Sequence, residues 1–309
     1  DSAEYFADVT AFMGNVPWHV LVIAITVIVL LIGAATQIEK ANKILMPLFF
    51  VLFSILAVRV FFLPGAKEGY EFLFVPKWEA LANIDTWVMA MGQAFFSLSI
   101  TGSGMIVYGS YLSKKEDIPR ASMQTAFFDT IAAMLSALAI MPAVFAFGIE
   151  PSAGPSLMFV TIPNIFKQMP MGRLFAVIFF LSVCFAGITS LINMFEAVIE
   201  SWQHKFKLKR NHAVLLCGAL TLIVGLFMEE EARVGTWMDF ITIIVVPFGA
   251  VLGAISIYYI LGFDKIKEEL EEGRKKRAFQ KFFKPTAKYI YVPLTIIVFI
   301  LGLVYKGIG

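Results

Sequence analysis

Residues 87–112 read WVMAMGQAFFSLSITGSGMIVYGSYL, an apolar stretch with a poor helix centre. Serine, threonine and glycine dominate residues 97–104, and each glycine costs roughly 1 kcal/mol of helix stability relative to alanine. A helix that breaks inside a bilayer exposes backbone groups, which are tolerated only where they line a cavity or bind something. Transporters hold ions and substrates in this way. Small residues also let two helices pack closely, so the composition alone leaves both explanations open.

The whole chain has the composition of a membrane protein. Of its 309 residues, 59% are hydrophobic and only 16% are charged, whereas soluble domains carry roughly 25% charged residues. A soluble surface needs polar cover, so this excess of apolar residues indicates that lipid is the solvent. The net charge of +2 is too small to indicate binding to nucleic acid, and no protein partner can be inferred.

Long apolar runs predict transmembrane helices, because backbone polar groups in hydrocarbon must be satisfied within the segment. Eight runs approach the roughly 20 residues that cross a bilayer, and they are Trp18–Thr36, Ile44–Leu63, Trp87–Leu112, Gln124–Gly148, Leu174–Trp202, His212–Met228, Trp237–Leu261 and Tyr289–Tyr305. Eighteen of the 25 lysines and arginines lie in alternate loops, which are therefore expected in the cytoplasm. The chain is then expected to begin outside, and an odd number of missing N-terminal spans would explain an external start without a signal peptide.

Two segments outside the spans have their own pattern. Phe159–Phe166, in the external loop 149–173, is expected to form a short helix that caps the external face. The cytoplasmic stretch 264–288 is highly charged. It is predicted to be a solvated amphipathic helix and linker, with contact to lipid headgroups as the alternative.

Asp129 is the sharpest single signal in the chain. It is the only charged residue between Ala121 and Gly148, and a charge in mid-membrane costs about 2.5–3.5 kcal/mol on insertion scales. Such a residue usually faces the protein interior and has a partner. No basic residue lies at comparable depth, so the partner is a cation, a proton or a basic group outside these spans. A purely structural, hydrogen-bonded acid is the alternative.

A second group of oxygen ligands lies in the fifth run. Ala186, Thr189 and Ser190 occupy positions i, i+3 and i+4 and so share one helix face. Two hydroxyls, with a carbonyl opened by Gly187, form an oxygen set suited to a small cation. Serine and threonine in membrane helices also often bond carbonyls of their own helix, and this alternative stays open.

Five segments spread over the chain carry a family resemblance. They are GQAFFSLS at 92–99, YGSY at 108–111, AGPSLMFVTIP at 153–163, FAGITS at 185–190 and MDF at 238–240. With them the sequence resembles the neurotransmitter:sodium symporter family, in particular its bacterial amino-acid transporters. The resemblance implies an all-α transmembrane bundle of two inverted five-helix repeats, in which the eight runs are family spans 4 to 11 and spans 1 to 3 are missing. Residues 1–63 would then end the first repeat, 64–262 would form the second with its broken helix 87–112, and 263–309 would form a cytoplasmic linker and a final span.

The resemblance also implies site residues, position by position. Ser97 and Asp129 match the first sodium site, and Ala186, Thr189 and Ser190 match the second. The substrate pocket would include Phe96, Ser97, Ser99, Thr101, Gly102, Ser190 and Met194, with Phe96 as the external lid. Gln93 and Asp239 match the external gate, and Ser110 and Tyr111 match the internal gate.

Three departures from the family pattern refine this expectation. Asp129 replaces the usual Asn and can supply the negative charge that a bound chloride supplies in chloride-dependent members. Ala133, one helical turn along, stands where chloride-independent members place a carboxylate, and it can neither supply a charge nor bind chloride. His204 stands where the family has an internal-gate Asp, so that latch is absent or rearranged. Gly102 stands where some leucine-type members have a pocket Phe, which opens room for a bulky substrate beside the adaptable Met194.

The expected function is sodium-coupled, chloride-independent symport of a bulky hydrophobic or aromatic amino acid across a cell membrane, most simply a bacterial inner membrane. Sodium is the coupling ion, and no enzymatic activity is expected. An intramembrane aspartyl protease needs two facing acids, and only Asp129 qualifies. An ion channel would not predict the matched segments. The alternatives that stay open are an inactive fragment of such a transporter and a related symporter of amines or organic solutes.

Overall fold

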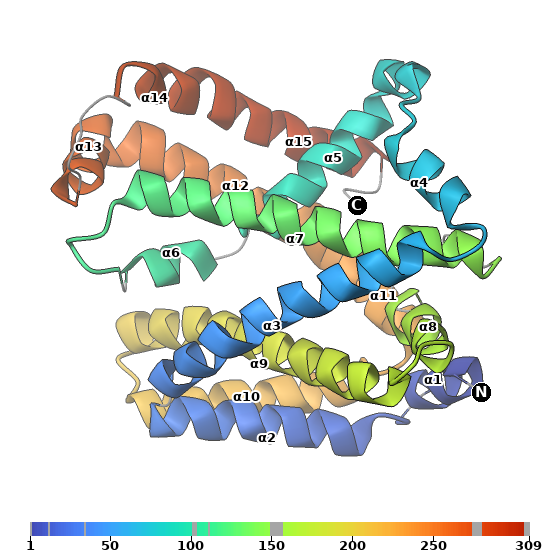
Figure 1. Cartoon of the computed structure of the whole chain (residues 1–309). Helices are drawn as coiled ribbons and strands as arrows, with labels where there is room; N and C mark the ends of the chain where they lie inside the picture. Colours follow the sequence, from blue (N-terminus) through green and yellow to red (C-terminus); the bar gives the residue numbers. More distant parts are fainter. Residues whose placement is uncertain are drawn as a thin grey trace. The chain divides into compact units, whose positions relative to one another are not determined.

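The computed structural model describes residues 2–11, 13–33, 35–100, 104–110, 112–148, 157–273 and 280–305. All regular structure within these ranges is helical, as the sequence predicts (Figure 1). The chain forms two compact units, Asp1–Pro76 with Ile131–Val234, and Lys77–Thr130 with Gly235–Gly309. Compact units and inverted repeats are different ways of dividing a chain, so the predicted repeat boundaries stay predictions.

In the first unit, the long apolar helices α3 and α9 pack against each other. Its helices are α1 (Ser2–Thr10), α2 (Val16–Ile32), α3 (Ala35–Phe61), α4 (Ala66–Phe74), the second half of α7 (Ile118–Ala146), η2 (Leu157–Thr161), α8 (Ile162–Lys167), α9 (Gly172–Phe206) and α10 (Arg210–Leu226). One core cluster joins α2, α9 and α10 around Leu30, Ile199 and Val214. Another joins α3, α7, α8 and α9 around Phe53 and Phe179.

Two close contacts fix the packing of α2 against α10. A Cβ atom at Gly218 would lie 2.5 Å from a side-chain methyl of Val27, so only glycine allows this approach. Near the other end, His19 of α2 lies 3.2 Å from Glu229, which follows α10 and is only 2% exposed. Where α9 ends and α10 begins, Glu196 of α9 pairs with Arg210 of α10.

The second unit holds the broken helix. Its elements are η1 (Trp78–Ala82), α5 (Ile84–Ser97), α6 (Gly104–Ser110), the first part of α7, most of α11 (Glu231–Phe240), η3 (Ile241–Val245), α12 (Val246–Ile255), η4 (Ser256–Leu261), α13 (Phe263–Glu272), α14 (Gln280–Thr286), η5 (Ala287–Tyr291) and α15 (Val292–Tyr305). α12 and α15 pack side by side (Figure 1). Phe95 of α5 is buried against Val298 of α15, which anchors the last turns of α5.

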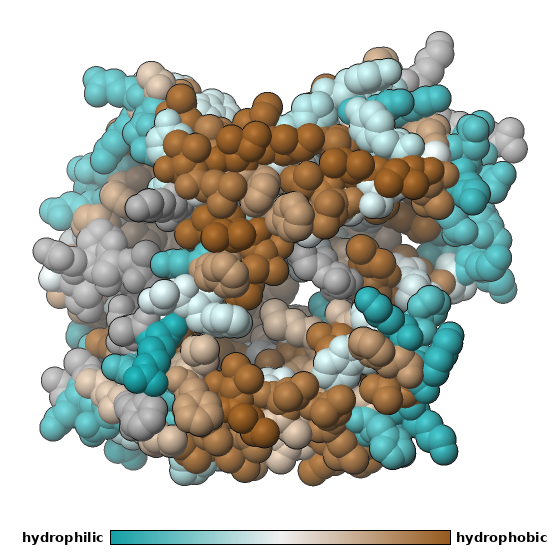
Figure 2. All heavy atoms as spheres, turned by 180° about the vertical axis from the view of Figure 1, so that it is seen from behind, coloured by the Kyte–Doolittle hydropathy of each residue, from teal (hydrophilic) through white to brown (hydrophobic). Residues whose placement is uncertain are grey.

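Each of the eight predicted spans overlaps described helix. Four stretches are long and apolar enough to cross a membrane, Ile118–Ala146, Gly172–Phe206, Arg233–Leu261 and Phe282–Tyr305, and the pair Met46–Phe61 with Ala66–Ala82 is bent by 115°. The helices α2 and α10 are apolar but shorter. Large apolar side chains such as Ile28, Ile223 and Ile260 are exposed, and Figure 2 shows apolar side chains across much of the surface, as lipid-facing helices require. The expected short helix at 159–166 is confirmed as η2 and α8.

Candidate functional site

The C-terminal end of α5 is a helix cap inside the apolar stretch. Ser99 donates its backbone N–H to the carbonyl of Phe96 (2.9 Å), and Ile100 donates to the carbonyl of Phe95 (3.1 Å). Ser99 has φ +51°, in the left-handed region. This pair of bonds around a left-handed residue is the Schellman motif, and Ile100 makes the accompanying apolar contact in the cluster of Phe95. The predicted break in this helix is therefore confirmed, and it begins at Ser97.

Two carbonyl groups follow at this helix end. No described backbone N–H donates to the carbonyl oxygen of Ser97 or of Leu98, and residues 101 and 102, which would donate to them in a continuous helix, lie outside the described residues. These oxygens lie at the C-terminal end of α5, where the helix dipole places partial negative charge and favours a cation. Carbonyls freed at a broken helix, together with a half-helix C-terminus, form the ion ligands of several transporter folds.

Ser97 and Asp129 are brought together at this helix end. The hydroxyl oxygen of Ser97 lies 2.6 Å from each carboxyl oxygen of Asp129, a distance typical of a charge-assisted O–H···O bond. Both residues are half-buried. The donated proton leaves the hydroxyl lone pairs free. One carboxylate and one hydroxyl thus meet at the negative end of α5, with no basic side chain paired to Asp129 among the described residues.

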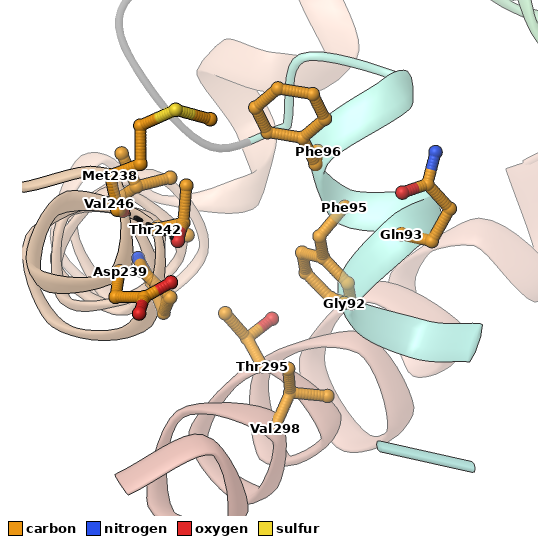
Figure 3. A pocket seen from close by; sticks show the side chains of 12 residues that line it. Gly92, Gln93, Phe95, Phe96, Met238, Asp239, Thr242, Val246, Thr295 and Val298 are labelled. Atoms are coloured by element: carbon orange, nitrogen blue, oxygen red, sulfur yellow. Dashed lines mark hydrogen bonds between the residues drawn. The ribbon is translucent and has the colours of Figure 1, made fainter. Parts of the chain in front are cut away.

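A cavity of about 180 Å³ lies beside the same helix, between α5, α11, η3, α12 and α15 (Figure 3). The predicted residues Gln93, Phe96 and Asp239 all line it. Two residues that the sequence did not single out, Thr242 and Thr295, also line it. Thr242 lies three residues after Asp239 and could have been found by helix spacing. Thr295 comes from a distant helix and gives no such signal.

The second predicted ion site lies on α9, in the other unit. The hydroxyls of Thr189 and Ser190 both donate to the carbonyl oxygen of Ala186, at 2.8 and 3.0 Å. Three oxygens are therefore close together, as expected. The expectation that Gly187 opens this carbonyl is wrong, because α9 runs unbroken from Gly172 to Phe206. The hydroxyls bond their own helix, and a cation here would have to share or displace those bonds.

The remaining predicted residues are placed as follows. Met194 is 62% exposed and lies one turn after the exposed Ser190, on the same face of α9. Ser110 ends α6 and donates to the carbonyl of Val107 at 2.6 Å, and His204 is exposed in the last turn of α9. Thr101, Gly102 and Tyr111 lie outside the described residues.

Comparison with known proteins gives a consistent result. A family model described as the sodium:neurotransmitter symporter family matches residues 5–307. The chain is 35% identical to the sodium-dependent transporter YhdH of Bacillus subtilis, over 91% of this chain and 65% of that protein. It is 31% identical to a sodium-dependent transporter of Haemophilus influenzae, over 96% of this chain and 68% of that protein. The chain thus spans about two thirds of the length of these relatives.

A solved structure agrees in fold. The crystal structure of MhsT in complex with L-phenylalanine matches with a TM-score of 0.85 and 31% identity, over 96% of this chain and 70% of that one. The resemblance first seen in five short segments therefore extends through nearly every described helix. From the family match and the fold together, this chain belongs to the sodium:neurotransmitter symporter family.

Proposed function

We propose that this chain forms the larger part of a sodium-coupled symporter that carries amino acids across the cell membrane by alternating access. The observation that carries the proposal is the contact of Ser97 with Asp129 at the open end of α5. The names of its relatives, which call them sodium-dependent transporters, support sodium as the coupling ion. Na⁺ would travel with the amino acid as a second substrate.

The chemistry of the Ser97–Asp129 site suits a small monovalent cation. A hard cation prefers oxygen ligands, and the site offers carboxylate, hydroxyl and carbonyl oxygens but no thiol or imidazole. Na⁺ would bind the carboxylate while the Ser97 proton stays shared with it. Because Asp129 supplies a full negative charge, one bound Na⁺ leaves the site neutral, and burial of that neutral pair costs less than burial of either charge alone.

The second ion would bind on α9 at Ala186, Thr189 and Ser190. A cation there would turn the two hydroxyls so that their lone pairs, rather than their protons, face it. The Ala186 carbonyl would lose two hydrogen bonds and gain a stronger ion contact. This site starts from satisfied bonds, so we expect it to bind Na⁺ more weakly than the Ser97–Asp129 site.

We propose a bulky hydrophobic or aromatic amino acid as the organic substrate. The family resemblance assigns Phe96, Ser97, Ser99, Ser190 and Met194, together with Thr101 and Gly102, to the substrate pocket. Met194 and Phe96 are large, apolar and exposed in the described chain, so both are available to cover an apolar side chain. The complex of MhsT with L-phenylalanine supports an aromatic substrate for this branch of the fold.

Access to this pocket would be controlled from both sides. Gln93, Phe96 and Asp239 line the cavity in Figure 3 and would close the external side over a bound substrate. The carboxyl group of Asp239 is exposed and forms no ion pair with a described residue. Ser110 and Tyr111 would belong to the internal gate. Loss of Na⁺ to the cytoplasm would then let the internal side open.

We further propose that transport is independent of chloride. The negative charge beside the first ion comes from Asp129, and Ala133, one turn along α7, offers neither a charge nor a hydrogen-bond donor. Relatives that are 33% and 27% identical are named as sodium- and chloride-dependent transporters. Chloride dependence therefore has to be tested for this chain itself.

The experiment is uptake by the full-length protein in proteoliposomes. An inward Na⁺ gradient should drive accumulation of labelled phenylalanine, tryptophan or leucine, and an equal K⁺ gradient should not. Absence of Na⁺-driven uptake for every amino acid and amine tested would refute the symporter. Uptake of glycine or alanine in strong preference to phenylalanine would leave the symporter standing and refute the bulky substrate.

A further inference from the structure

A second cavity, of about 370 Å³, lies at the other end of the same unit and shares no residue with the proposed transport site. Its walls come from the first turns of α7, from η4 and from α13 and α14. Phe263, Ile266 and Leu270 of α13 face it at positions i, i+3 and i+7, which makes one apolar helix face. Phe283 packs against the rings of both Tyr258 and Phe263, so aromatic contacts brace the walls.

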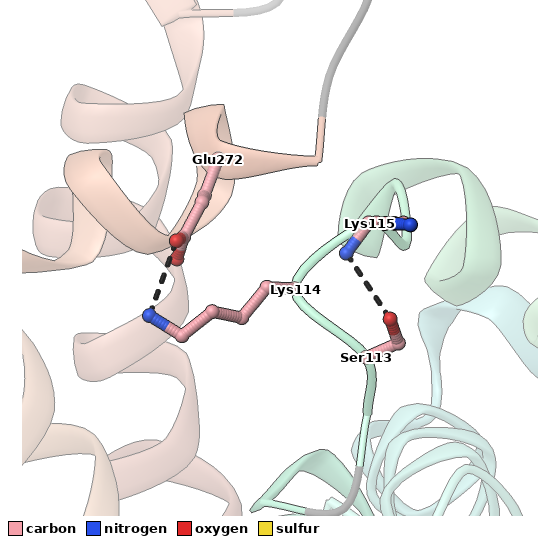
Figure 4. Close-up of polar contacts among 4 residues, drawn as sticks. All are labelled: Ser113, Lys114, Lys115 and Glu272. Atoms are coloured by element: carbon pink, nitrogen blue, oxygen red, sulfur yellow. Dashed lines mark hydrogen bonds and ion pairs between the residues drawn. The ribbon is translucent and has the colours of Figure 1, made fainter.

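The helix α13 is fixed over this cavity by contacts with the loop before α7. Lys114 in that loop donates to Glu272 at the end of α13, at 3.2 Å (Figure 4). A Cβ atom at Gly273 would lie 1.9 Å from the backbone oxygen of Glu116, so Gly273 lies directly on this loop and this position requires glycine. The cavity is therefore framed by packed helices rather than by a single exposed helix face.

Two ammonium groups accompany the apolar walls. Lys267 lines the cavity and is only loosely paired, 3.9 Å from Glu271, with 46% of its side chain exposed. The ammonium group of Lys284 lies 5.3 Å from the ring centre of Phe263, which forms part of the wall. Lys284 forms no ion pair with any described carboxylate. The cavity thus combines apolar walls with one weakly paired cation in its lining and a second cation over a wall residue, which forms no ion pair with a described residue.

The membrane position of this cavity limits what can occupy it. The distribution of lysine and arginine predicts that the loops at 113–117 and 264–288 are cytoplasmic, where the bilayer leaflet carries anionic lipids. A lipid tail gains little by moving from the bilayer into an apolar cavity, because both surroundings are apolar. Selectivity must then come from the headgroup, and two cations favour an anionic one.

We propose that this cavity binds one anionic phospholipid of the cytoplasmic leaflet. An acyl chain would lie against Phe263, Ile266 and Leu270, and the phosphate would lie between Lys267 and Lys284. The site is independent of the transport cycle proposed above. A bound lipid would link α7 to α13 and α14, and would stabilise this end of the unit.

The test is a lipid titration of the delipidated full-length protein, followed by native mass spectrometry. Phosphatidylglycerol should bind in preference to phosphatidylcholine with the same acyl chains. A lysine near an anionic headgroup contributes about a five-fold change in affinity. The double variant Lys267→Gln/Lys284→Gln should therefore weaken binding of phosphatidylglycerol by about 30-fold. The control Lys265→Gln/Lys288→Gln removes the same charge from lysines that neither line the cavity nor lie over one of its wall residues, and should change binding far less.

Two further arms identify the occupant. Leu270→Trp keeps every charge but fills the cavity, and should also weaken binding of phosphatidylglycerol. Free glycerol 3-phosphate should not compete, because it lacks the chain that the walls hold. Four results would each overturn the proposal. They are equal binding of the two lipids, equal losses of binding in both double variants, effective competition by glycerol 3-phosphate, and no lipid bound because another part of the protein fills the cavity.

Discussion

Replacement of Asp129 by asparagine tests the proposed ion site most directly, because it removes the charge and keeps the shape of the side chain. An ion held by the Asp129 carboxylate and the Ser97 carbonyl would lie within about 4 Å of the carboxylate charge. Two unit charges at that distance interact by about 4 kcal/mol at an effective dielectric constant of 20. Asp129 is only half-buried, so water screens part of this energy, and we expect a loss of about 2 kcal/mol. That is a rise of about 30-fold in the sodium concentration for half-maximal substrate binding.

The assay is binding of a labelled amino acid to the full-length protein as Na⁺ replaces choline at constant ionic strength. Asp264→Asn makes the same chemical change on the exposed surface of α13 and should leave the sodium dependence unchanged. Ser97→Ala should weaken the sodium dependence less than Asp129→Asn. The double variant should show a coupling of about 0.5–3 kcal/mol, because the two groups share one hydrogen bond. The refuting result is a half-maximal sodium concentration for Asp129→Asn that stays within about three-fold of the wild-type value, which is a free-energy change below about 0.7 kcal/mol. That result would show that Asp129 does not bind the ion.

Three further predictions concern chloride, backbone strain and a buried acid. Replacement of chloride by gluconate should leave Na⁺-driven uptake unchanged, and a large loss of uptake would refute the role given to Asp129. Ser99→Gly should raise the free energy of unfolding by about 1 kcal/mol, because glycine adopts a positive φ without strain, and it should weaken substrate binding. The control Ser201→Gly, within α9, should lower the free energy of unfolding by a similar amount. A lower free energy of unfolding in both variants would contradict the strain argument. His19→Ala removes the imidazole that lies 3.2 Å from the buried carboxylate of Glu229, whose oxygens accept no hydrogen bond from a described group. It should destabilise the protein by about 1–3 kcal/mol, because a buried polar group then loses its nearest polar neighbour. His19→Ala/Glu229→Leu should recover much of that loss, and an unchanged unfolding temperature in the single variant would show that the pair does not hold α2 to α10.

Much of the fold could be predicted from the sequence because hydropathy alone determines where a membrane helix can lie. Every predicted span overlaps described helix, and the serine- and glycine-rich centre of 87–112 predicted a break that the structure confirms. The position of the break was harder to predict. Helix propensity favours Gly102 or Gly104 as the residue where the helix stops, but α5 ends at Ser97. The buried Phe95 and its contact with Ile100 stabilise the cap at Leu98 and Ser99.

The site could be predicted only where its members follow each other closely in sequence or match a known pattern. Asp129 was conspicuous as a lone charge, but its contact with Ser97 depends on the packing of α5 and α7, which no local rule gives. Thr295 could not be found for the same reason. The error at Gly187 has the opposite cause, since a glycine in a long apolar helix need not open it when the neighbouring turns remain bonded.

Two unfavourable features meet at the end of α5, and their coincidence is more informative than either of them alone. A non-glycine residue in the left-handed region costs about 1–2 kcal/mol, and a charge within a membrane helix costs about 2.5–3.5 kcal/mol. Ser99 and Asp129 bring both features to one helix end. A purely structural role for Asp129 would account for its hydrogen bond with Ser97, but a neutral side chain could accept the same bond at a lower cost. The proposed cation would neutralise the carboxylate, and it would lie at the C-terminal end of α5, where the helix dipole favours a positive charge.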